Sequence, residues 1–365
     1  MNLRKSAGRW VGDGTVVIRQ GLFLLWFWAV SQAIAQAPGV VIEEWVNQEQ
    51  HSALLKKALA LRDSGELTPG EKLKEQFKNP EPALIRTSPP HTAPLDPTLL
   101  ARRAREIRLW IMALYICPKC RNWHLQDFAA AYAVAPDVLV TCEHAFSERM
   151  GRQPKEGFKE SYLLVRDSQH RLFGVKSILA VNSVMDAALL RVDPPHLIPV
   201  PLNDQLAPGD PVFCYSDPLG QTGYFSDGIL NRFYWSPGRR GSPDSLEQLS
   251  YLRVNFGTDW APGSSGAPIL DQCGNVAGHV SSIQALSRPQ PDVQMTQNKS
   301  EEKNQKQPVA NFNPPLITIH EGIPARGVMA LIRDVNDRAD VDPPKPTALV
   351  KDPSISPRHE SSEAP

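Results

Sequence analysis

The sequence predicts a mainly antiparallel all-β protein, a sandwich or a barrel, with a helical N-terminal extension and a C-terminal helix. Beyond Asp127, short apolar runs follow one another at close spacing, and turn residues bound each of them. Such a pattern is typical of antiparallel sheets. The 34 prolines gather in a few stretches of the 365 residues. Those stretches are therefore expected to be linkers, loops or tails.

Residues 1–35 have the parts of a secretory signal peptide. Basic residues precede a short apolar run at 21–30, and Ala33-Ile34-Ala35 offers a small-x-small cleavage site. We therefore expect a periplasmic or secreted protein, with no stable membrane insertion after cleavage. The apolar run is too short to cross a bilayer comfortably. A chain tethered to the membrane by an uncleaved signal anchor is thus the less favoured alternative.

Residues 36–109 are expected to form an N-terminal extension of helices and linkers. Apolar residues recur at roughly helical spacing between Ile42 and Leu59, and a second helical segment is expected over 97–110. The arginines of that second segment are interpreted as a solvated helix face. Basic and acidic side chains balance at 39 each, so no overall field favours nucleic acid as a partner.

The main domain is expected over residues 110–338. Residues 286–315 are rich in Gln, Asn, Lys, Glu and Pro and predict a long polar loop within it. A helical pattern resumes over 323–338, and the proline-rich residues 339–365 predict a disordered tail. The expected strands are 128–134, 138–142, 162–166, 171–181, 187–192, 211–215, 222–235, 251–256, 267–270 and 276–283.

The stretch Ala261-Pro-Gly-Ser-Ser-Gly-Ala-Pro268 lies between two apolar strands and predicts a nucleophile turn. A nucleophilic serine needs an exposed hydroxyl on a tight turn, with backbone N–H groups converging where an oxyanion develops. Gly263 and Gly266 permit that turn, and Ser265 is the candidate nucleophile. The N–H groups of Gly263 and Ser265 are the candidate oxyanion hole. Ordinary hairpin turns use the same residue types, so this stretch is only moderately specific.

Two further segments supply partners for the serine. His144 follows the apolar run Val138–Thr141, where an imidazole can accept the proton of the serine. Asp186 opens the run Asp-Ala-Ala-Leu-Leu, where a carboxylate can hold the second ring nitrogen and set the tautomer. A histidine alone there would more often be structural, and an aspartate alone would be a turn residue or strand cap. The joint occurrence of all three segments favours catalysis.

Together these segments resemble the trypsin-like serine peptidases, especially their bacterial HtrA-type branch. In that family Thr-x-x-His carries the base, Asp-x-Ala-Leu-Leu the aspartate and Gly-x-Ser-Gly-x-Pro the nucleophile, in the chain order that this sequence keeps. The likeness covers roughly residues 110–338 and includes Asp217-Pro-Leu-Gly220. It implies a chymotrypsin-like fold of two six-stranded antiparallel β-barrels. It also implies a serine endopeptidase that acts on protein or peptide substrates and needs no cofactor.

The sequence departs from the family at a few positions. Cys142-Glu143 stand where small residues usually precede the histidine, and Ala267 replaces a common glycine. Ser264 stands where the animal digestive enzymes keep an aspartate that pairs with a newly cut N-terminus, so activation of their kind is not expected. No Gly-Leu-Gly-Phe motif follows the expected domain, so the PDZ module of many HtrA proteins is expected to be missing.

The resemblance leaves cleavage preference open. Asp259 precedes Ser265 by six positions, the spacing at which trypsin holds the carboxylate of its primary specificity pocket. A pocket of that kind would select Arg or Lys before the scissile bond, with Ser281 and Ser282 along one wall. The competing interpretation makes Thr258-Asp259 a structural loop pair of the HtrA type. It is slightly favoured, because the loop lengths differ from those of the animal enzymes.

The chain contains five cysteines, which cannot all pair with one another. Cys117, Cys120 and His124 have the spacing of three tetrahedral zinc ligands, but a structural zinc site normally has a fourth. In an exported protein disulfides are the favoured interpretation. No metal is therefore expected, and zinc at these three residues is the less favoured alternative.

Two other functions fit the same sequence. One is a catalytically retired trypsin fold used for binding, and the other is a periplasmic chaperone whose proteolysis is secondary. A complete triad favours activity, because a retired enzyme has no physical need to retain three matched groups.

Overall fold

The computed structural model describes residues 46–145, 160–238, 241–242, 244–286 and 315–341. The expected signal peptide, nearly all of the expected polar loop and all but the first residues of the expected tail lie outside these ranges. The chain divides into two compact units, residues 1–50 and 51–365. Only residues 46–50 of the first unit are described, and they include the start of helix α2 (Gln48–Asp63). The fold and the site described below belong to the second unit.

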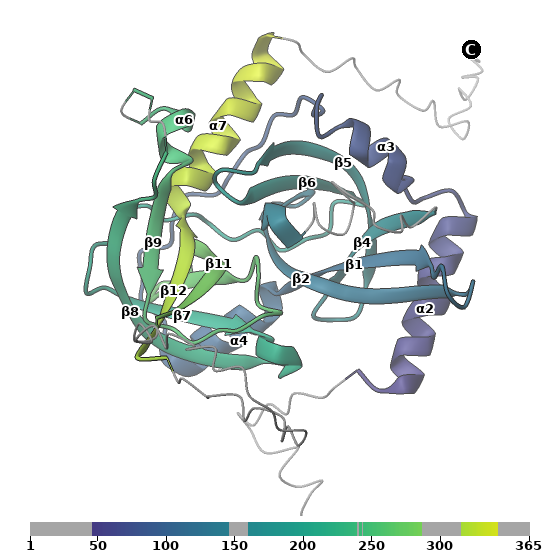
Figure 1. Cartoon of the computed structure of the whole chain (residues 1–365), viewed down its shortest axis with the longest axis horizontal. Helices are drawn as coiled ribbons and strands as arrows, with labels where there is room; N and C mark the ends of the chain where they lie inside the picture. The colour runs from purple at the N-terminus through teal and green to yellow at the C-terminus, as the bar shows by residue number, and fades with distance from the viewer. Residues whose placement is uncertain (1–45, 146–159, 239–240, 243, 287–314, 342–365) are drawn as a thin grey trace, which may run out of the picture. The chain divides into compact units, whose positions relative to one another are not determined.

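Twelve strands of the second unit form two closed antiparallel barrels of six strands each, with the orders β1-β2-β3-β6-β5-β4 and β10-β11-β12-β9-β8-β7 (Figure 1). The two-barrel, chymotrypsin-like fold expected from the sequence is therefore confirmed. The strands are β1 (Leu109–Ile116), β2 (Trp123–Ala135), β3 (Val138–Thr141), β4 (Ser161–Asp167), β5 (Leu172–Asn182), β6 (Ala187–Asp193), β7 (Pro211–Ser216), β8 (Tyr224–Trp235), β9 (Leu252–Phe256), β10 (Pro268–Asp271), β11 (Val276–Leu286) and β12 (Ile317–Pro324).

Helices precede the barrels and follow them. α3 (Gly70–Glu75) and α4 (Pro97–Ile107) belong to the N-terminal extension, and α7 (Ala325–Val341) closes the fold. A short helix, α6 (Leu246–Leu249), and a 3₁₀ turn, η1 (Pro218–Gly220), lie within the second barrel region. α7 ends three residues beyond the boundary expected at residue 338. Within the described residues, no helix combines the length and the hydropathy that a membrane crossing needs.

Two strands were not expected from the sequence. The helical segment expected over 97–110 ends at Ile107, because Arg108 adopts an extended backbone with φ −66° and ψ 131°. β1 follows at once. Its continuous apolar run is buried along most of its length, so it shows no alternation by which a strand would be recognised. β12 lies just after the expected polar loop, and the residues of its first half are exposed or half-buried.

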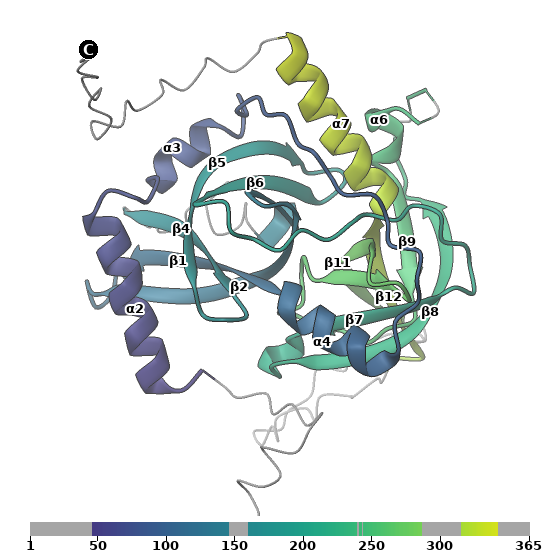
Figure 2. The same ribbon diagram turned by 180° about the vertical axis from the view of Figure 1, so that it is seen from behind.

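The N-terminal extension is part of the main core. Asp96 caps α4 by accepting hydrogen bonds from the backbone N–H groups of Thr98 and Leu99. The buried face of α4 joins a cluster that also contains residues of both barrels and of α7. Figure 2 shows α4 beside β7 of the second barrel. Fully burying an aliphatic side chain such as Leu100 contributes about 1.5–3 kcal/mol, so α4 holds the two barrels together.

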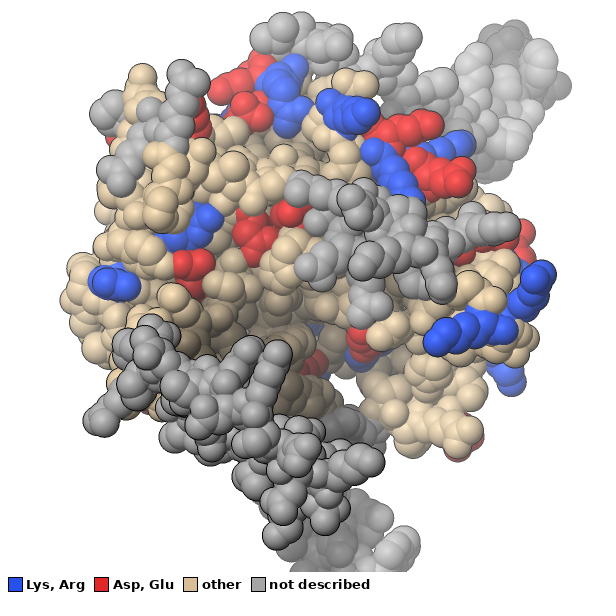
Figure 3. Space-filling view, viewed as in Figure 1, with Lys and Arg blue, Asp and Glu red and all other residues tan. Residues whose placement is uncertain are grey.

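The charges on the surface are mixed in sign. On the face drawn in Figure 3, acidic and basic side chains alternate without a large patch of either sign. This distribution agrees with the balanced composition of the chain. A basic stripe of the kind that binds nucleic acid is not seen on this face.

Candidate active site

The turn that carries Ser265 connects β9 and β10 and requires two glycines. Gly263 and Gly266 both adopt positive φ, +105° and +83°. A Cβ atom at Gly266 would lie 2.2 Å from the carbonyl oxygen of Ala130, and one at Gly263 would lie 2.7 Å from that of Asp217. Any larger residue would therefore collide with backbone. The N–H of Ala130 donates to the carbonyl of Ser265 over 2.8 Å, which places the turn where β2 of the first barrel meets the second barrel.

His144 lies between Ser265 and Asp186. It sits in a helical turn at residues 143–145, shortly after β3 ends. Its Nε2 is 3.1 Å from Oγ of Ser265, and its Nδ1 is 2.9 and 3.0 Å from the two carboxylate oxygens of Asp186. Because a carboxylate can only accept, Nδ1 carries the hydrogen and the lone pair of Nε2 faces the serine hydroxyl. This is the arrangement in which an imidazole can remove the proton of a hydroxyl.

Asp186 is held from several sides at the turn before β6, where it adopts a positive φ of 63°. Its carboxylate accepts hydrogen bonds from the backbone N–H of His144, over 2.9 Å, and from the hydroxyl of Ser281. Burial raises the pKa of this carboxyl group, but the hydrogen bonds from His144 and Ser281 outweigh burial and hold the pKa below its usual value. Asp186 is therefore ionised at neutral pH.

Ser281 and Ser282 do not share one role. The hydroxyl of Ser281, which was predicted to line a pocket wall, donates to the carboxylate of Asp186. Ser282 is exposed, and its hydroxyl donates to a carboxylate oxygen of Glu321 over 3.1 Å. The register of β11 shifts between Val280 and Ser282, and the two serines contact different carboxylates.

His279 contacts the backbone of Asp186, and sequence reasoning missed it. Its side chain is completely buried. Its Nε2 donates to the backbone carbonyl of Asp186 over 3.2 Å, and its Nδ1 is 3.4 Å from the hydroxyl oxygen of Tyr132. Burial lowers the pKa of His279 to about 4, so the ring stays neutral and supports the backbone of Asp186. A histidine within the apolar start of β11 is the signal that could have identified it.

His279 makes the fold sensitive to acid. The unfolded chain binds a proton at this ring near pH 6.5, whereas the folded chain binds it only near pH 4. Stability from this group is therefore present above pH 6.5 and is lost as the pH falls towards 4. We expect the free energy of unfolding to drop by about 2 kcal/mol between about pH 7 and about pH 5 from this residue. Urea unfolding at both pH values checks this, and a His279→Gln variant with an unchanged pH dependence would contradict it.

The N–H groups of the nucleophile turn fall into two sets. Those of Ser264, Gly266 and Ala267 donate to backbone carbonyls over 3.1, 2.9 and 2.9 Å. Those of Gly263 and Ser265 have no backbone acceptor among the described residues. These two are the donors expected to form an oxyanion hole, and they are available to a ligand.

The loop that supports this turn is held by the end of the N-terminal extension. The N–H of Leu219 donates to the carbonyl of Pro262 over 2.8 Å, which joins the loop to the turn. In the same loop, Asp217 pairs with buried Arg108 at 3.1 Å and accepts a 2.6 Å hydrogen bond from Nε1 of Trp110. Arg108 therefore lies inside the protein and does not belong to the solvated helix face expected for it.

Asp259 is exposed. Its backbone N–H and carbonyl both bond to the hydroxyl of Ser226, over 3.1 and 3.2 Å. Its neighbour Trp260 is buried, packs against Phe256 and donates from Nε1 to the carbonyl of Ser282 over 3.3 Å. These contacts anchor the loop to β8 and β11. A separate cavity of about 470 Å³ between β8, α6 and the start of α7 contains none of the triad residues in its lining.

All five cysteines are free thiols, so the disulfides favoured by the sequence are not formed in this structure. Cys142 is buried beside the triad, where its Sγ donates to the carbonyl of Val280 over 2.9 Å. Burial raises the pKa of this thiol well above its usual value. Burial likewise raises the pKa of Cys214 to about 12. Both act as small buried side chains.

Comparison with known proteins agrees with this geometry. Residues 129–278 match the model of a family described as a trypsin-like peptidase domain. The chain is also 30% identical over 110 residues to a Synechocystis sp. protein named "Putative serine protease HhoB", a match that covers 30% of this chain and 26% of that protein. The chain thus spans about a quarter of the length of this curated relative.

The matched residues include the nucleophile turn, His144, Asp186 and the strands that carry them. The two six-stranded barrels and the order His, Asp, Ser along the chain belong to the same family pattern. By its fold, its motifs and these matches, the chain contains a trypsin-like peptidase domain over residues 129–278.

Proposed function

We propose that this chain is an exported serine endopeptidase in which Ser265, His144 and Asp186 form the catalytic triad. One observation carries the proposal. The imidazole of His144 is within hydrogen-bond distance of the Ser265 hydroxyl at one nitrogen and of the Asp186 carboxylate at the other. General-base activation of a serine needs this pair of contacts.

The reaction is acyl transfer. Oγ of Ser265 attacks the carbonyl carbon of a peptide bond while Nε2 of His144 takes its proton, and the ionised Asp186 stabilises the imidazolium. The N–H groups of Gly263 and Ser265 stabilise the oxyanion, and each such donor is worth about 10²- to 10³-fold in rate. When the C–N bond breaks, the imidazolium protonates the leaving amine. Water, deprotonated by His144, then releases the acyl group from Ser265.

A fluorophosphonate probe tests the proposal, because it forms a covalent bond only with an activated serine hydroxyl. We expect the folded protein to be labelled once, at Ser265, and a Ser265→Ala variant to remain unlabelled. Peptide mass spectrometry distinguishes an adduct on Ser265 from one on its neighbour Ser264. A folded wild-type protein that takes up no probe would contradict the proposal and favour a retired, binding fold.

The proposed substrates are proteins or peptides in the compartment outside the cytoplasmic membrane. The signal-like residues 1–35 support export. N-terminal sequencing of the protein recovered from the periplasm or the medium tests this part, and the expected new N-terminus is Gln36. A full-length chain recovered with the membrane fraction would instead support the uncleaved anchor.

Asp259 is expected not to set cleavage preference. Because it is exposed and its backbone contacts are structural, an Asp259→Asn change should alter kcat/KM by no more than about 2-fold for any substrate. The measurement compares matched peptides with Arg, Lys, Leu or Val before the scissile bond. A loss confined to Arg and Lys peptides, of about 10²-fold or more, would restore the basic-pocket interpretation.

A further inference from the structure

The turn between β1 and β2 brings two thiols and an imidazole together, away from the triad. β1 ends at Ile116 and β2 begins at Trp123. In the turn between them, the N–H of Arg121 donates to the carbonyl of Cys117, and the N–H of Cys117 donates to the carbonyl of Asn122, each over 2.9 Å. Arg121 adopts a positive φ of 58°. The chain therefore folds back on itself within six residues.

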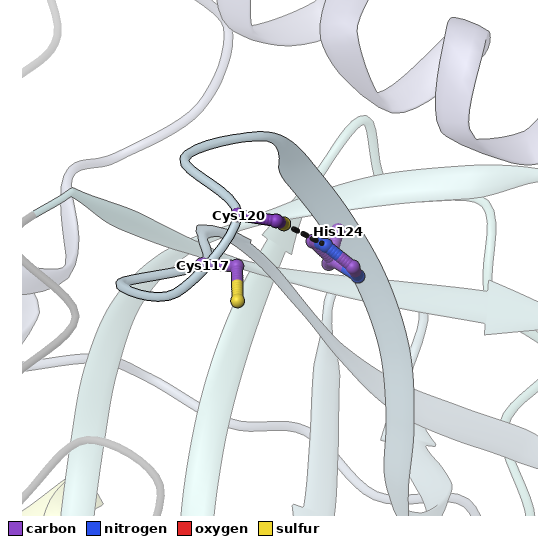
Figure 4. Close-up of side chains that lie close together, drawn as sticks. All are labelled: Cys117, Cys120 and His124. Atoms are coloured by element: carbon purple, nitrogen blue, oxygen red, sulfur yellow. Dashed lines mark hydrogen bonds between the residues drawn. The ribbon is translucent and has the colours of Figure 1, made fainter.

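The potential ligand atoms of this turn converge. Sγ of Cys120 is 3.0 Å from Nε2 of His124, and the two sulfur atoms and a ring nitrogen of His124 all lie within 4.8 Å of one another (Figure 4). In a tetrahedral zinc site the Zn–S and Zn–N bonds are about 2.3 and about 2.0 Å. Ligand atoms in such a site are therefore separated by about 3.5–3.8 Å. The observed separations, 3.0 Å for one pair and no more than 4.8 Å for the others, are close to this spacing.

The surroundings favour ligation at Cys120 and His124. The ring of His124 stacks on Tyr115 with centroids 5.8 Å apart and planes 22° apart, which fixes its orientation. Cys120 and His124 are exposed, so an ion and a water molecule can reach them from solvent.

We propose that Cys117, Cys120 and His124 bind one Zn²⁺ ion through two thiolates and an imidazole nitrogen, with water in the fourth position. Two thiolates balance the charge of the ion, and this donor set suits zinc. The site does not depend on the proposed peptidase function. It joins the two ends of the β1–β2 turn, so its role is to stabilise this end of the first barrel. The competing fate of the same pair is a Cys117–Cys120 disulfide, which would consume both thiolate ligands.

The experiment uses the full chain, reduced and freed of metal by a chelator, and then titrated with Zn²⁺. We expect elemental analysis after desalting to find about one equivalent per chain. Titration with Co²⁺ in place of Zn²⁺ should give the visible absorption of tetrahedral cobalt and a thiolate-to-cobalt charge-transfer band. These readouts do not involve peptidase activity, so they separate this inference from the proposed function.

Three variants and one control locate the ion. Cys117→Ser, Cys120→Ser and His124→Ala should each abolish the stoichiometric binding and the cobalt bands, whereas Cys273→Ser, which removes a half-buried thiol outside the turn, should keep both. Circular dichroism confirms that each variant is folded. The proposal is overturned if the reduced wild-type protein binds no Zn²⁺. It is also overturned if Cys273→Ser loses as much Zn²⁺ binding as the three variants of the turn. A Cys117–Cys120 disulfide in freshly isolated, unreduced protein also overturns it.

Discussion

Replacing Ser265 by alanine is expected to lower kcat/KM for peptide hydrolysis by about 10⁴- to 10⁶-fold. The change removes the Oγ atom that would form the acyl-enzyme, while the barrels and the oxyanion donors remain. The small methyl group fits where the hydroxymethyl group lay, because the turn is held by its backbone hydrogen bonds and by Gly263 and Gly266. We therefore expect an inactive protein of unchanged stability.

Ser264 provides the matched control. It is the neighbouring serine of the same turn, is completely buried, and its hydroxyl has no hydrogen-bond partner within the described part of the chain. A Ser264→Ala variant should stay within about 3-fold of wild type, because its N–H still bonds the carbonyl of Ala261. Initial rates on a quenched fluorescent peptide, with urea unfolding for both variants, make the comparison. If Ser264→Ala abolished activity and Ser265→Ala preserved it, the assignment of the nucleophile would be wrong.

An Asp186→Asn change is expected to lower kcat by about 10⁴-fold with little effect on KM. In the wild-type protein, the carboxylate of Asp186 accepts the hydrogen on Nδ1 of His144. An asparagine can turn its NH₂ group to that nitrogen, which leaves the hydrogen on Nε2, facing Ser265. The imidazole then has no lone pair with which to take the serine proton. It also loses the negative charge that stabilises the imidazolium.

A Ser281→Ala variant tests whether Asp186 affects kcat through the orientation of its carboxylate. Ser281→Ala removes one donor to Asp186 but leaves both contacts with His144, so we expect a fall in kcat of about 10-fold and an unchanged KM. Steady-state kinetics on one peptide for both variants provide the measurement. A large rise in KM for Ser281→Ala, with kcat preserved, would instead return Ser281 to the wall of a substrate pocket.

Much of the fold was predictable, because it depends on patterns that are local in the sequence. Short apolar runs bounded by turns predicted most strands, and the three motifs indicated the family and therefore the two barrels. The turn at Gly263 and Gly266 needs positive φ at both positions, a demand that only particular residues meet. β1 was not predicted, because a continuous apolar run has no period by which strand and helix can be distinguished.

The roles of other residues depended on contacts between distant parts of the chain. Ser281 and Asp186 are 95 positions apart in the sequence, but a hydrogen bond joins their side chains. His279 reaches the backbone of Asp186 across 93 positions. The sequence predicts that Arg108 is exposed together with its neighbouring arginines. In the structure Arg108 is buried and forms an ion pair with Asp217. No periodicity or spacing encodes such pairs, because barrel closure and the approach of the two barrels create them.

By itself the sequence determined the resemblance to the trypsin-like peptidases, the candidate triad and the turn that displays Ser265, since each depends on a short run of residues. Only the tertiary structure decided which residues contact the candidate triad and which lie elsewhere. It assigned Ser281 to Asp186, placed Asp259 at the surface, and showed the cysteines as free thiols. The physical reason is that burial, hydrogen bonding and thiol pairing depend on neighbours in space, and closure of the barrels selects those neighbours.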